Sequence, residues 1–331
     1  MKIFLFLALV ITTSCSKLVL NKGNKKSYDS ILTGYKYPFK TNSLALRSQE
    51  KSLQMSYMDV GPKSSQKIAL LLHGKNFAGY YWEDVANFLI KKGYRVIIPD
   101  QIGFGKSSKP QSYQFSFYQW SLNTYKLLDS LAINSVTIIG HSMGGMLATH
   151  MTYDRPGRVK KMILINPIGL EPYLKYAQYK DPSFFYEREL AKTPDKFRNY
   201  QKNNYYDGKW SPKYESLLIP HIGQMNNPEW KKVAWNNALT YGPIFTEDIT
   251  RLFSEIKRPV RLIIGTRDKT GPGRGWLKKG VKHKLGQYKK LAHKTKIAFP
   301  HALLYTLEGL GHMPHFESFP RFETTFLKAI N

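Results

Sequence analysis

Cysteine is nearly absent from this chain, which has only Cys15 among its 331 residues. A single cysteine excludes an internal disulfide framework and any zinc site built on paired cysteines. The histidines include no H-E-x-x-H motif, and we therefore expect neither a bound metal nor another cofactor. A glycine-rich stretch ends in Gly105-Lys106-Ser107 like a phosphate-binding loop, but Asp100 stands where that loop requires its first glycine.

Acidic residues are scarce. The chain has 23 of them against 50 lysines and arginines, which gives a net charge of +27 and an isoelectric point of about 9.9. Such a charge makes nucleic acid the first partner to consider. The lysines are spread along the whole chain and no nucleic-acid motif accompanies them. We therefore expect no nucleic-acid partner. A lysine-rich genome composition or contact with an acidic envelope surface accounts better for the charge.

The N-terminal apolar run is short, with nine residues from Ile3 to Ile11. It is too short to span a bilayer, which takes about 20 residues. Lys2 precedes it and small residues follow it, which is the layout of a signal peptide. Cys15 then resembles the lipidated cysteine of a bacterial lipoprotein. We expect export to the periplasm or a lipid anchor on Cys15 in the bacterial envelope, with residues 1–27 as signal peptide and tether. A plain cleaved signal and no signal at all are the alternatives.

Apolar β-branched runs and helical spacing alternate along most of the chain. The apolar runs predict buried strands at 68–72, 94–100, 136–139, 161–166, 260–265 and 302–307. Helical spacing is found at 81–92, 115–131, 146–154 and 319–330. Before them, the sequence predicts the start of a strand pair at 35–39 and 43–47. It also predicts a partly exposed strand at 53–60. This alternation predicts an α/β fold with a mostly parallel, doubly wound sheet.

The strand pattern stops between residues 171 and 246, where aromatic residues, lysine and asparagine dominate. We interpret this segment as an inserted, mainly helical cap, and residues 28–170 and 247–331 as the core that carries it. Its aromatic residues predict a pocket for a small-molecule substrate with an apolar acyl or aryl group. A basic insertion at 269–296 has no function that the sequence indicates.

The stretch Gly140-His141-Ser142-Met143-Gly144 follows one of the apolar runs and precedes helical spacing. A G-x-S-x-G motif between a strand and a helix is the nucleophile elbow of a serine hydrolase. Its glycines allow the strand and the helix to approach closely, since they carry no Cβ. The motif alone also fits an ordinary turn, but its position predicts that Ser142 is a catalytic nucleophile.

Two further residues complete a triad with Ser142. A serine needs an imidazole to take its proton and a carboxylate to orient that imidazole. Asp268 and His312 each follow a predicted strand, in the order expected for this architecture. Taken singly, Asp268 also fits a turn or a helix cap, and His312 also fits an ordinary loop histidine. Other histidines that compete for the role of base are His315, His301 and His293.

Backbone N–H groups are the expected oxyanion donors. One is that of Met143, directly after the nucleophile, and the second is that of Lys75, just after His73-Gly74. The side chain of Lys75 is immaterial to this role. No metal ligand is predicted.

Together these residues resemble the α/β-hydrolase superfamily, in the capped branch that holds esterases, C–C hydrolases, epoxide hydrolases and haloalkane dehalogenases. The resemblance covers residues from about 35 to 331. Epoxide hydrolases and dehalogenases carry aspartate as nucleophile where this chain has Ser142. The motifs that carry the resemblance are Leu72-His73-Gly74, Pro99 to Ser107, Gly140 to Gly145, Gly265 to Asp268, and Gly311 to Pro314.

The resemblance implies an enzyme that cleaves a carboxylic ester through an acyl-enzyme intermediate. Hydrolysis of a C–C bond, as in the meta-cleavage-product hydrolases, or of an amide on the same triad is the alternative within enzymes. A non-catalytic envelope protein that binds an anionic polymer is the alternative of another class.

Overall fold

The computed structural model describes residues 26–331. The N-terminal apolar run and Cys15 lie outside these residues, so the signal peptide and the lipid anchor stay predictions. The described residues contain an eight-stranded sheet of order β1-β2-β4-β3-β5-β6-β7-β8. Its strands are β1 (Thr41–Ser48), β2 (Lys51–Val60), β3 (Ile68–Leu72), β4 (Arg95–Pro99), β5 (Val136–His141), β6 (Val159–Ile165), β7 (Val260–Gly265) and β8 (Ala302–Leu307).

The sheet is parallel from β4 to β8. At its edge β1 and β2 form an antiparallel hairpin, and β2 also runs antiparallel to β4. The prediction of a mostly parallel, doubly wound α/β sheet is therefore confirmed. It is wrong for residues 35–39, which form no strand, because Pro38 has no N–H to offer a neighbouring strand and Tyr37 hydrogen bonds through its hydroxyl to Asp100 at 2.7 Å.

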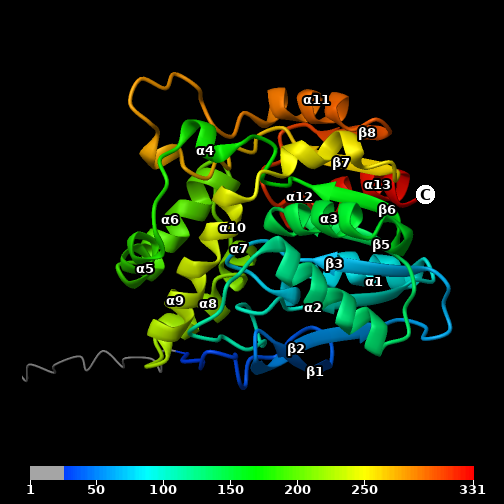
Figure 1. Ribbon diagram of the computed structural model, residues 1–331, viewed down its shortest axis with the longest axis horizontal. Helices are drawn as coiled ribbons and strands as arrows, with labels where there is room; N and C mark the ends of the chain where they lie inside the picture. Colours follow the sequence, from blue (N-terminus) through cyan, green and yellow to red (C-terminus); the bar gives the residue numbers. More distant parts are fainter. Residues whose placement is uncertain (1–25) are drawn as a thin grey trace, which may run out of the picture.

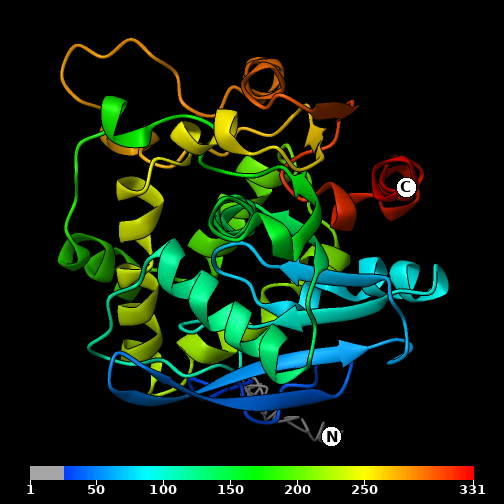
Figure 2. The same ribbon diagram turned by 45° about the vertical axis from the view of Figure 1, so that its right-hand side comes forward.

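Helices cover both faces of the sheet (Figures 1 and 2). The strand side chains alternate between two cores: Leu70 and Leu72 belong to one, and Ala69 and Leu71 to the other. Completely apolar strands arise because both faces are buried in this way. The first core packs against α2 (Phe117–Ser130), α3 (Met143–Asp154) and α11 (Tyr288–Ala298), and the second against α1 (Glu83–Lys91) and α13 (Phe319–Ile330).

The helix starts follow from local sequence. Glu83 and Asp84 occupy the first turn of α1, where acidic groups favour the positive end of the helix dipole. Ser116 precedes α2, and its hydroxyl accepts a hydrogen bond from the Gln119 N–H at 2.9 Å. The elbow helix α3 begins directly after Ser142, so the end of β5 and the start of α3 are joined by a single residue.

Seven α-helices and one 3-10 helix lie between β6 and β7. Figure 1 shows α5, α6, α8, α9 and α10 gathered at one end of the sheet. The structure thus has helices where the sequence predicts an inserted cap. Their bounds are α4 (Tyr173–Tyr176), α5 (Pro182–Leu190), α6 (Pro194–Tyr205), α7 (Pro212–Ser216), α8 (Ile219–Met225), α9 (Trp230–Leu239) and α10 (Tyr241–Thr246).

The basic insertion at 269–296 divides into two parts. Its end forms most of α11, which packs beside β7 and β8. Its beginning is an irregular loop that lies beside α4 (the orange loop in Figure 1). The backbone N–H of Lys278 donates to the carbonyl of Tyr176, and that of Gln178 donates to the carbonyl of Trp276, both at 2.9 Å. A short helix α12 (Pro314–Glu317) then follows β8.

Candidate active site

Ser142 has a strained backbone, with φ 56° and ψ −121°, at the tight turn between β5 and α3. A non-glycine residue adopts positive φ at a cost, which persists only where the surroundings enforce it. Here the enforcing contact is the close approach of helix and strand. A Cβ added to Gly144 would lie 2.1 Å from the carbonyl oxygen of Leu72, and one added to Gly140 would lie 2.3 Å from that of Gly144. The two glycines therefore permit the turn that presents Ser142.

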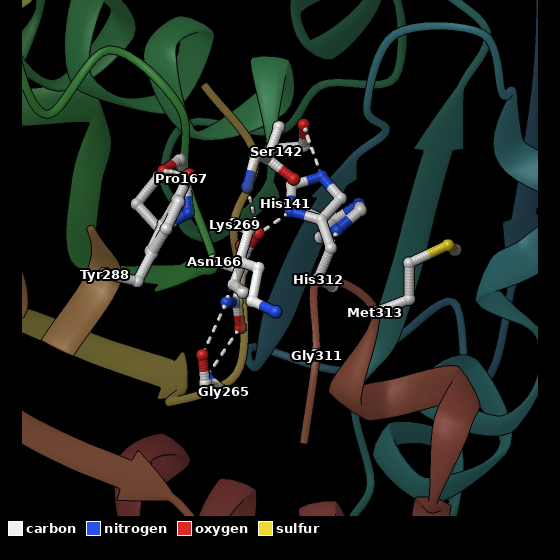
Figure 3. A network of polar contacts seen from close by, with 12 residues as sticks. His141, Ser142, Asn166, Pro167, Gly265, Lys269, Tyr288, Gly311, His312 and Met313 are labelled. Carbon is white, nitrogen blue, oxygen red and sulfur yellow. Dashed lines mark hydrogen bonds and ion pairs between the residues drawn. The ribbon is translucent and has the colours of Figure 1, made fainter. Parts of the chain in front are cut away.

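The structure brings the three predicted triad residues together, although they come from three separate strand ends. His312 Nε2 lies 3.0 Å from Ser142 Oγ, and His312 Nδ1 lies 2.7 Å from Asp268 Oδ2. All three side chains are buried. Figure 3 shows Ser142 beside the ring of His312, with the dashed contact between them. The arrangement can accept a proton from the serine and hold the resulting imidazolium against a carboxylate.

Asn166 is a site residue that the sequence analysis missed. It directly follows β6 and has φ 39°, and its Nδ2 donates to Asp268 Oδ2 at 2.8 Å. Its Oδ1 accepts the N–H of Gly265 at 2.9 Å, a contact drawn in Figure 3. One side chain thus fixes both the end of β7 and the carboxylate of Asp268. The Thr270 N–H holds Asp268 Oδ1 at 2.7 Å. The available signal was an asparagine directly after a buried strand, at the sheet edge where catalytic groups gather.

The competing histidines do not reach Ser142. His315 is buried and stacks on Trp82 with ring centroids 4.9 Å apart. Neither of its ring nitrogens has a hydrogen-bond partner among residues 26–331. Burial, and after it the neighbouring His312, lower the pKa of His315 to about 3. His293 and His301 are exposed, one on α11 and the other before β8.

The residues expected to supply the oxyanion donors, Met143 and Lys75, are close to Ser142 in the structure: Met143 follows it directly, and Lys75 lines the same cavity. Met143 is the first residue of α3, and the first N–H groups of a helix have no partner within it. Gly74 packs so closely that an added Cβ would lie 3.0 Å from that of Ser142. The N–H of Gly74 donates to the Tyr81 hydroxyl at 2.8 Å, which fixes the loop that leads to Lys75.

The Lys75 side chain has a structural role that is separate from the predicted oxyanion role of its backbone N–H. Its Nζ donates to the carbonyl of Asn237 at 2.9 Å and to the Thr240 hydroxyl at 3.1 Å, and lies 3.8 Å from the ring centre of Tyr241. The last turn of α9 attracts a cation because its carbonyls point outward. Burial lowers the pKa of Lys75 to about 7. The loop after β3 is therefore tied to the helices between β6 and β7.

His141 joins the elbow to the loops on either side. Its Nε2 lies 2.9 Å from the carbonyl of His312, and only a protonated Nε2 can donate there. Its Nδ1 is then an acceptor for the Tyr81 hydroxyl at 3.0 Å. Burial, followed by the neighbouring His315 and His312, lowers the pKa of His141 well below its ordinary value. A neutral His141 thus fixes the backbone of His312 through one nitrogen and the Gly74 loop through the other.

A cavity of about 530 Å³ opens at Ser142. Its wall comes from α5, α6, α10 and the irregular loop of the basic insertion. Tyr205 of α6 covers His312, with ring centroids 4.7 Å apart. The insertion thus has a structural role that the sequence did not indicate, as one wall of the cavity. The aromatic lining includes Phe185, Phe197, Tyr205, Tyr241, Phe245 and Trp276.

Two negative observations apply to residues 26–331. No group of three or more histidine, cysteine or acidic side chains there is arranged to hold a metal ion. No helix in this part of the chain is both long enough and apolar enough to cross a membrane.

A parallel sheet with an antiparallel edge, helices on both faces and an elbow serine at a strand end define the α/β-hydrolase class of fold. The family described as the alpha/beta hydrolase fold matches residues 69–319. The chain belongs to this family.

A solved structure with high similarity is that of a "probable hydrolytic enzyme" from Pseudomonas aeruginosa PAO1. It is 36% identical, with a TM-score of 0.90, over 93% of this chain and 99% of that one. A haloalkane dehalogenase of Psychrobacter cryohalolentis is 33% identical over 116 residues, 35% of this chain and 38% of the relative. A 2-hydroxymuconate semialdehyde hydrolase of Pseudomonas putida is 35% identical over 103 residues, 31% and 37% of the two chains. The chain thus matches well under half the length of these two relatives.

Proposed function

We propose that this protein is a serine hydrolase that cleaves a carboxylic ester through an acyl-enzyme intermediate. The observation that carries the proposal is the continuous chain of contacts from Ser142 Oγ through His312 to Asp268, at 3.0 and 2.7 Å. A serine hydroxyl is a weak nucleophile and needs such a base to take its proton. The strained elbow supports the same reaction, because it presents Ser142 in the lining of the cavity.

In the first half of the proposed reaction, Ser142 Oγ attacks the ester carbonyl while His312 Nε2 accepts its proton. Asp268 holds the ring through Nδ1 and stabilises the imidazolium. The tetrahedral oxyanion accepts hydrogen bonds from the N–H groups of Met143 and Lys75. One such donor contributes about 3–4 kcal/mol to stabilising the transition state. His312 then protonates the leaving alcohol, and the acyl group remains on Ser142.

In the second half, a water molecule occupies the place of the alcohol. His312 takes a proton from this water as it attacks the acyl carbonyl. The second tetrahedral intermediate collapses, the proton returns to Ser142 and the carboxylic acid leaves. Tyr205 lies over His312, and this cover limits access of bulk water to the base.

Dehalogenation is excluded by the chemistry of Ser142. Displacement of a halide by an aspartate leaves an alkyl ester on the enzyme, which water can hydrolyse. The same displacement by a serine leaves an alkyl ether, which this base and these donors cannot cleave. The likeness to a dehalogenase over 116 residues therefore supports the fold, but not that reaction.

Hydrolysis of a C–C bond is the second candidate, favoured by the relative named 2-hydroxymuconate semialdehyde hydrolase. An amidase reaction would use the same groups. A panel of substrates separates these reactions. Turnover of a vinylogous diketone without turnover of short-chain esters would favour the C–C reaction, and turnover of anilides alone would favour an amidase.

Replacement of the nucleophile tests the proposal. Ser142→Ala should lower hydrolysis of 4-nitrophenyl esters by about 10⁴-fold or more while the circular dichroism spectrum stays unchanged. Ser254→Ala, at an exposed serine, is the matched control and should keep full activity. A fluorophosphonate probe should label the wild type at Ser142. A well-folded wild type that is neither labelled nor active would instead support a non-catalytic binding protein.

A further inference from the structure

The wall of the cavity beside Ser142 carries an excess of positive charge. Among the side chains that line it are four cationic ones, Arg188, Lys192, Lys196 and Arg274, and a single acidic one, Glu189. Lys75 also lines the cavity, but burial lowers its pKa to about 7. The chain as a whole has roughly two basic residues for each acidic residue, so the excess in the cavity is greater than composition alone gives. The sequence predicts a pocket for an apolar acyl or aryl group and gives no sign of this charge.

The single carboxylate is already neutralised. Glu189 is buried and lies 2.6 Å from Lys192 Nζ. Burial alone would raise the pKa of Glu189, but Lys192 and Lys75 together hold it below its ordinary value. Glu189 therefore stays ionised and compensates the charge of Lys192.

The other three cations have no acidic partner. Among residues 26–331, none of them forms an ion pair within 4.0 Å. Lys196 donates to the carbonyl of Ala191 at 3.1 Å, and Arg274 donates to backbone carbonyls of its own loop. The guanidinium carbon of Arg188 lies 5.5 Å from the ring centroid of Phe184 and 5.6 Å from that of Trp276. Backbone carbonyls and rings leave the formal charge uncompensated.

A free hydrogen-bond donor lies in the same wall. Thr270 is 8% exposed, and its hydroxyl has no partner among the described residues. Its backbone N–H holds Asp268, so this hydroxyl lies next to the triad. An unpaired buried hydroxyl costs free energy, and an acceptor oxygen on a ligand would remove that cost.

We propose that the substrate carries an anionic group, a carboxylate or a phosphate, which the cationic wall of Arg188, Lys196 and Arg274 binds. The aromatic rings of the cavity then hold the apolar part that joins this group to the scissile ester. This inference rests on the proposed ester hydrolysis and narrows its substrate class. All three residues are exposed, so the driving force is the attraction of an anion to unpaired charges that salt screens.

Paired esters that differ only in charge test the proposal. On the acyl side, mono-4-nitrophenyl adipate is compared with 4-nitrophenyl hexanoate, which has the same chain length. On the alcohol side, 4-acetoxybenzoate is compared with 4-acetoxybenzamide. We expect kcat/KM to be about tenfold higher or more for the anionic member of at least one pair. Raising NaCl from about 0.05 to about 0.5 M should reduce this ratio.

Variants locate the effect in the wall. Arg188→Gln and Lys196→Met should each lower the ratio of anionic to neutral kcat/KM by about threefold to tenfold, and the double variant should lower it further. Lys202→Met is the matched control, because Lys202 lies on α6 outside the cavity lining, and it should keep the wild-type ratio. Inhibition by adipate and by phenyl phosphate, ranked against each other, assigns carboxylate or phosphate.

The outcomes separate this inference from the proposed function. Ratios near one for both pairs, with neutral esters hydrolysed in a Ser142-dependent way, would overturn the anionic substrate and leave the esterase standing. A loss of ratio in Lys202→Met equal to that in Lys196→Met would also overturn it. An absence of Ser142-dependent hydrolysis of all four esters would instead contradict the proposed function.

Discussion

At the scale of single residues, two side chains next to the triad hold its members in position. Asn166 holds one oxygen of Asp268 and the end of β7. His141 holds the backbone of His312 and, through Tyr81, the Gly74 loop. Both residues act through other residues, so they position the proposed machinery without touching a substrate. Such supporting contacts decide whether a serine and a base remain within hydrogen-bonding distance.

Replacement of Asn166 should reduce catalysis without changing substrate binding. In Asn166→Ala, Asp268 loses one of its donors and the Gly265 N–H loses its acceptor, so we expect kcat for a 4-nitrophenyl ester to fall about tenfold to a hundredfold, with KM within about twofold. The limb of the kcat pH profile that reports the base should shift with it, which a merely structural change would not produce.

The control for this prediction is Glu50→Ala. Glu50 lies in the turn between β1 and β2, is exposed and also has positive φ, 60°, so this variant carries the same backbone cost away from the site. It should keep wild-type kcat. A wild-type kcat and pH profile in Asn166→Ala would show that Asp268 needs no support from this side chain.

At the scale of elements, two features give the site its shape. The first is the close approach of α3 to β3 and β5, which glycine permits. The second is the irregular loop of the basic insertion, which is fixed by Glu171. This buried carboxylate accepts hydrogen bonds from the Gly286 N–H and from His283 Nε2, both at 2.7 Å. The insertion thereby becomes a wall of the cavity that carries Arg274 and Trp276.

An added methyl group at Gly144 should disrupt the approach of α3. Its Cβ would lie 2.1 Å from the carbonyl oxygen of Leu72 and 2.6 Å from the carbonyl carbon. Both are backbone atoms, which cannot move aside as the end of a flexible side chain can. We expect Gly144→Ala to lower the free energy of unfolding by about 3 kcal/mol or more, measured by urea denaturation. Gly157→Ala, where a Cβ meets open space, should change it by less than about 0.5 kcal/mol. Equal stabilities would show that the elbow relaxes freely.

At the scale of the whole molecule, Lys75 connects the sheet to the helices between β6 and β7. It follows β3, and its ammonium group bonds to the end of α9. The proposed oxyanion donor and the cover of the cavity are therefore parts of one structure. Export and a lipid on Cys15 also concern the whole molecule, and they stay predictions that mass spectrometry of the mature protein can check.

The lowered pKa of Lys75 makes stability depend on pH. Its pKa is about 7 in the fold against an ordinary value of 10.5, so between these values the unfolded chain binds a proton that the folded chain does not. Stability contributed by this residue therefore rises with pH across that window. Relative to Lys75→Met, the wild-type free energy of unfolding should gain on the order of 1 kcal/mol per pH unit between about pH 7.5 and 9.5. A constant difference would mean that Lys75 keeps its ordinary pKa.

The sequence by itself determined the strand order along the chain, the elbow at Ser142 and the positions of Asp268 and His312 past strand ends. These follow from local rules, because the period of apolar residues and the glycines of a tight turn are written in neighbouring residues. Only the tertiary structure decided the role of Asn166, the contacts of the Lys75 side chain and the wall formed by the basic insertion. Those contacts join residues 100 or more positions apart. The pattern of neighbouring residues does not encode which distant segments come into contact. For the same reason the charge of the cavity emerged only when α5, α6 and the loop carrying Arg274 were placed together.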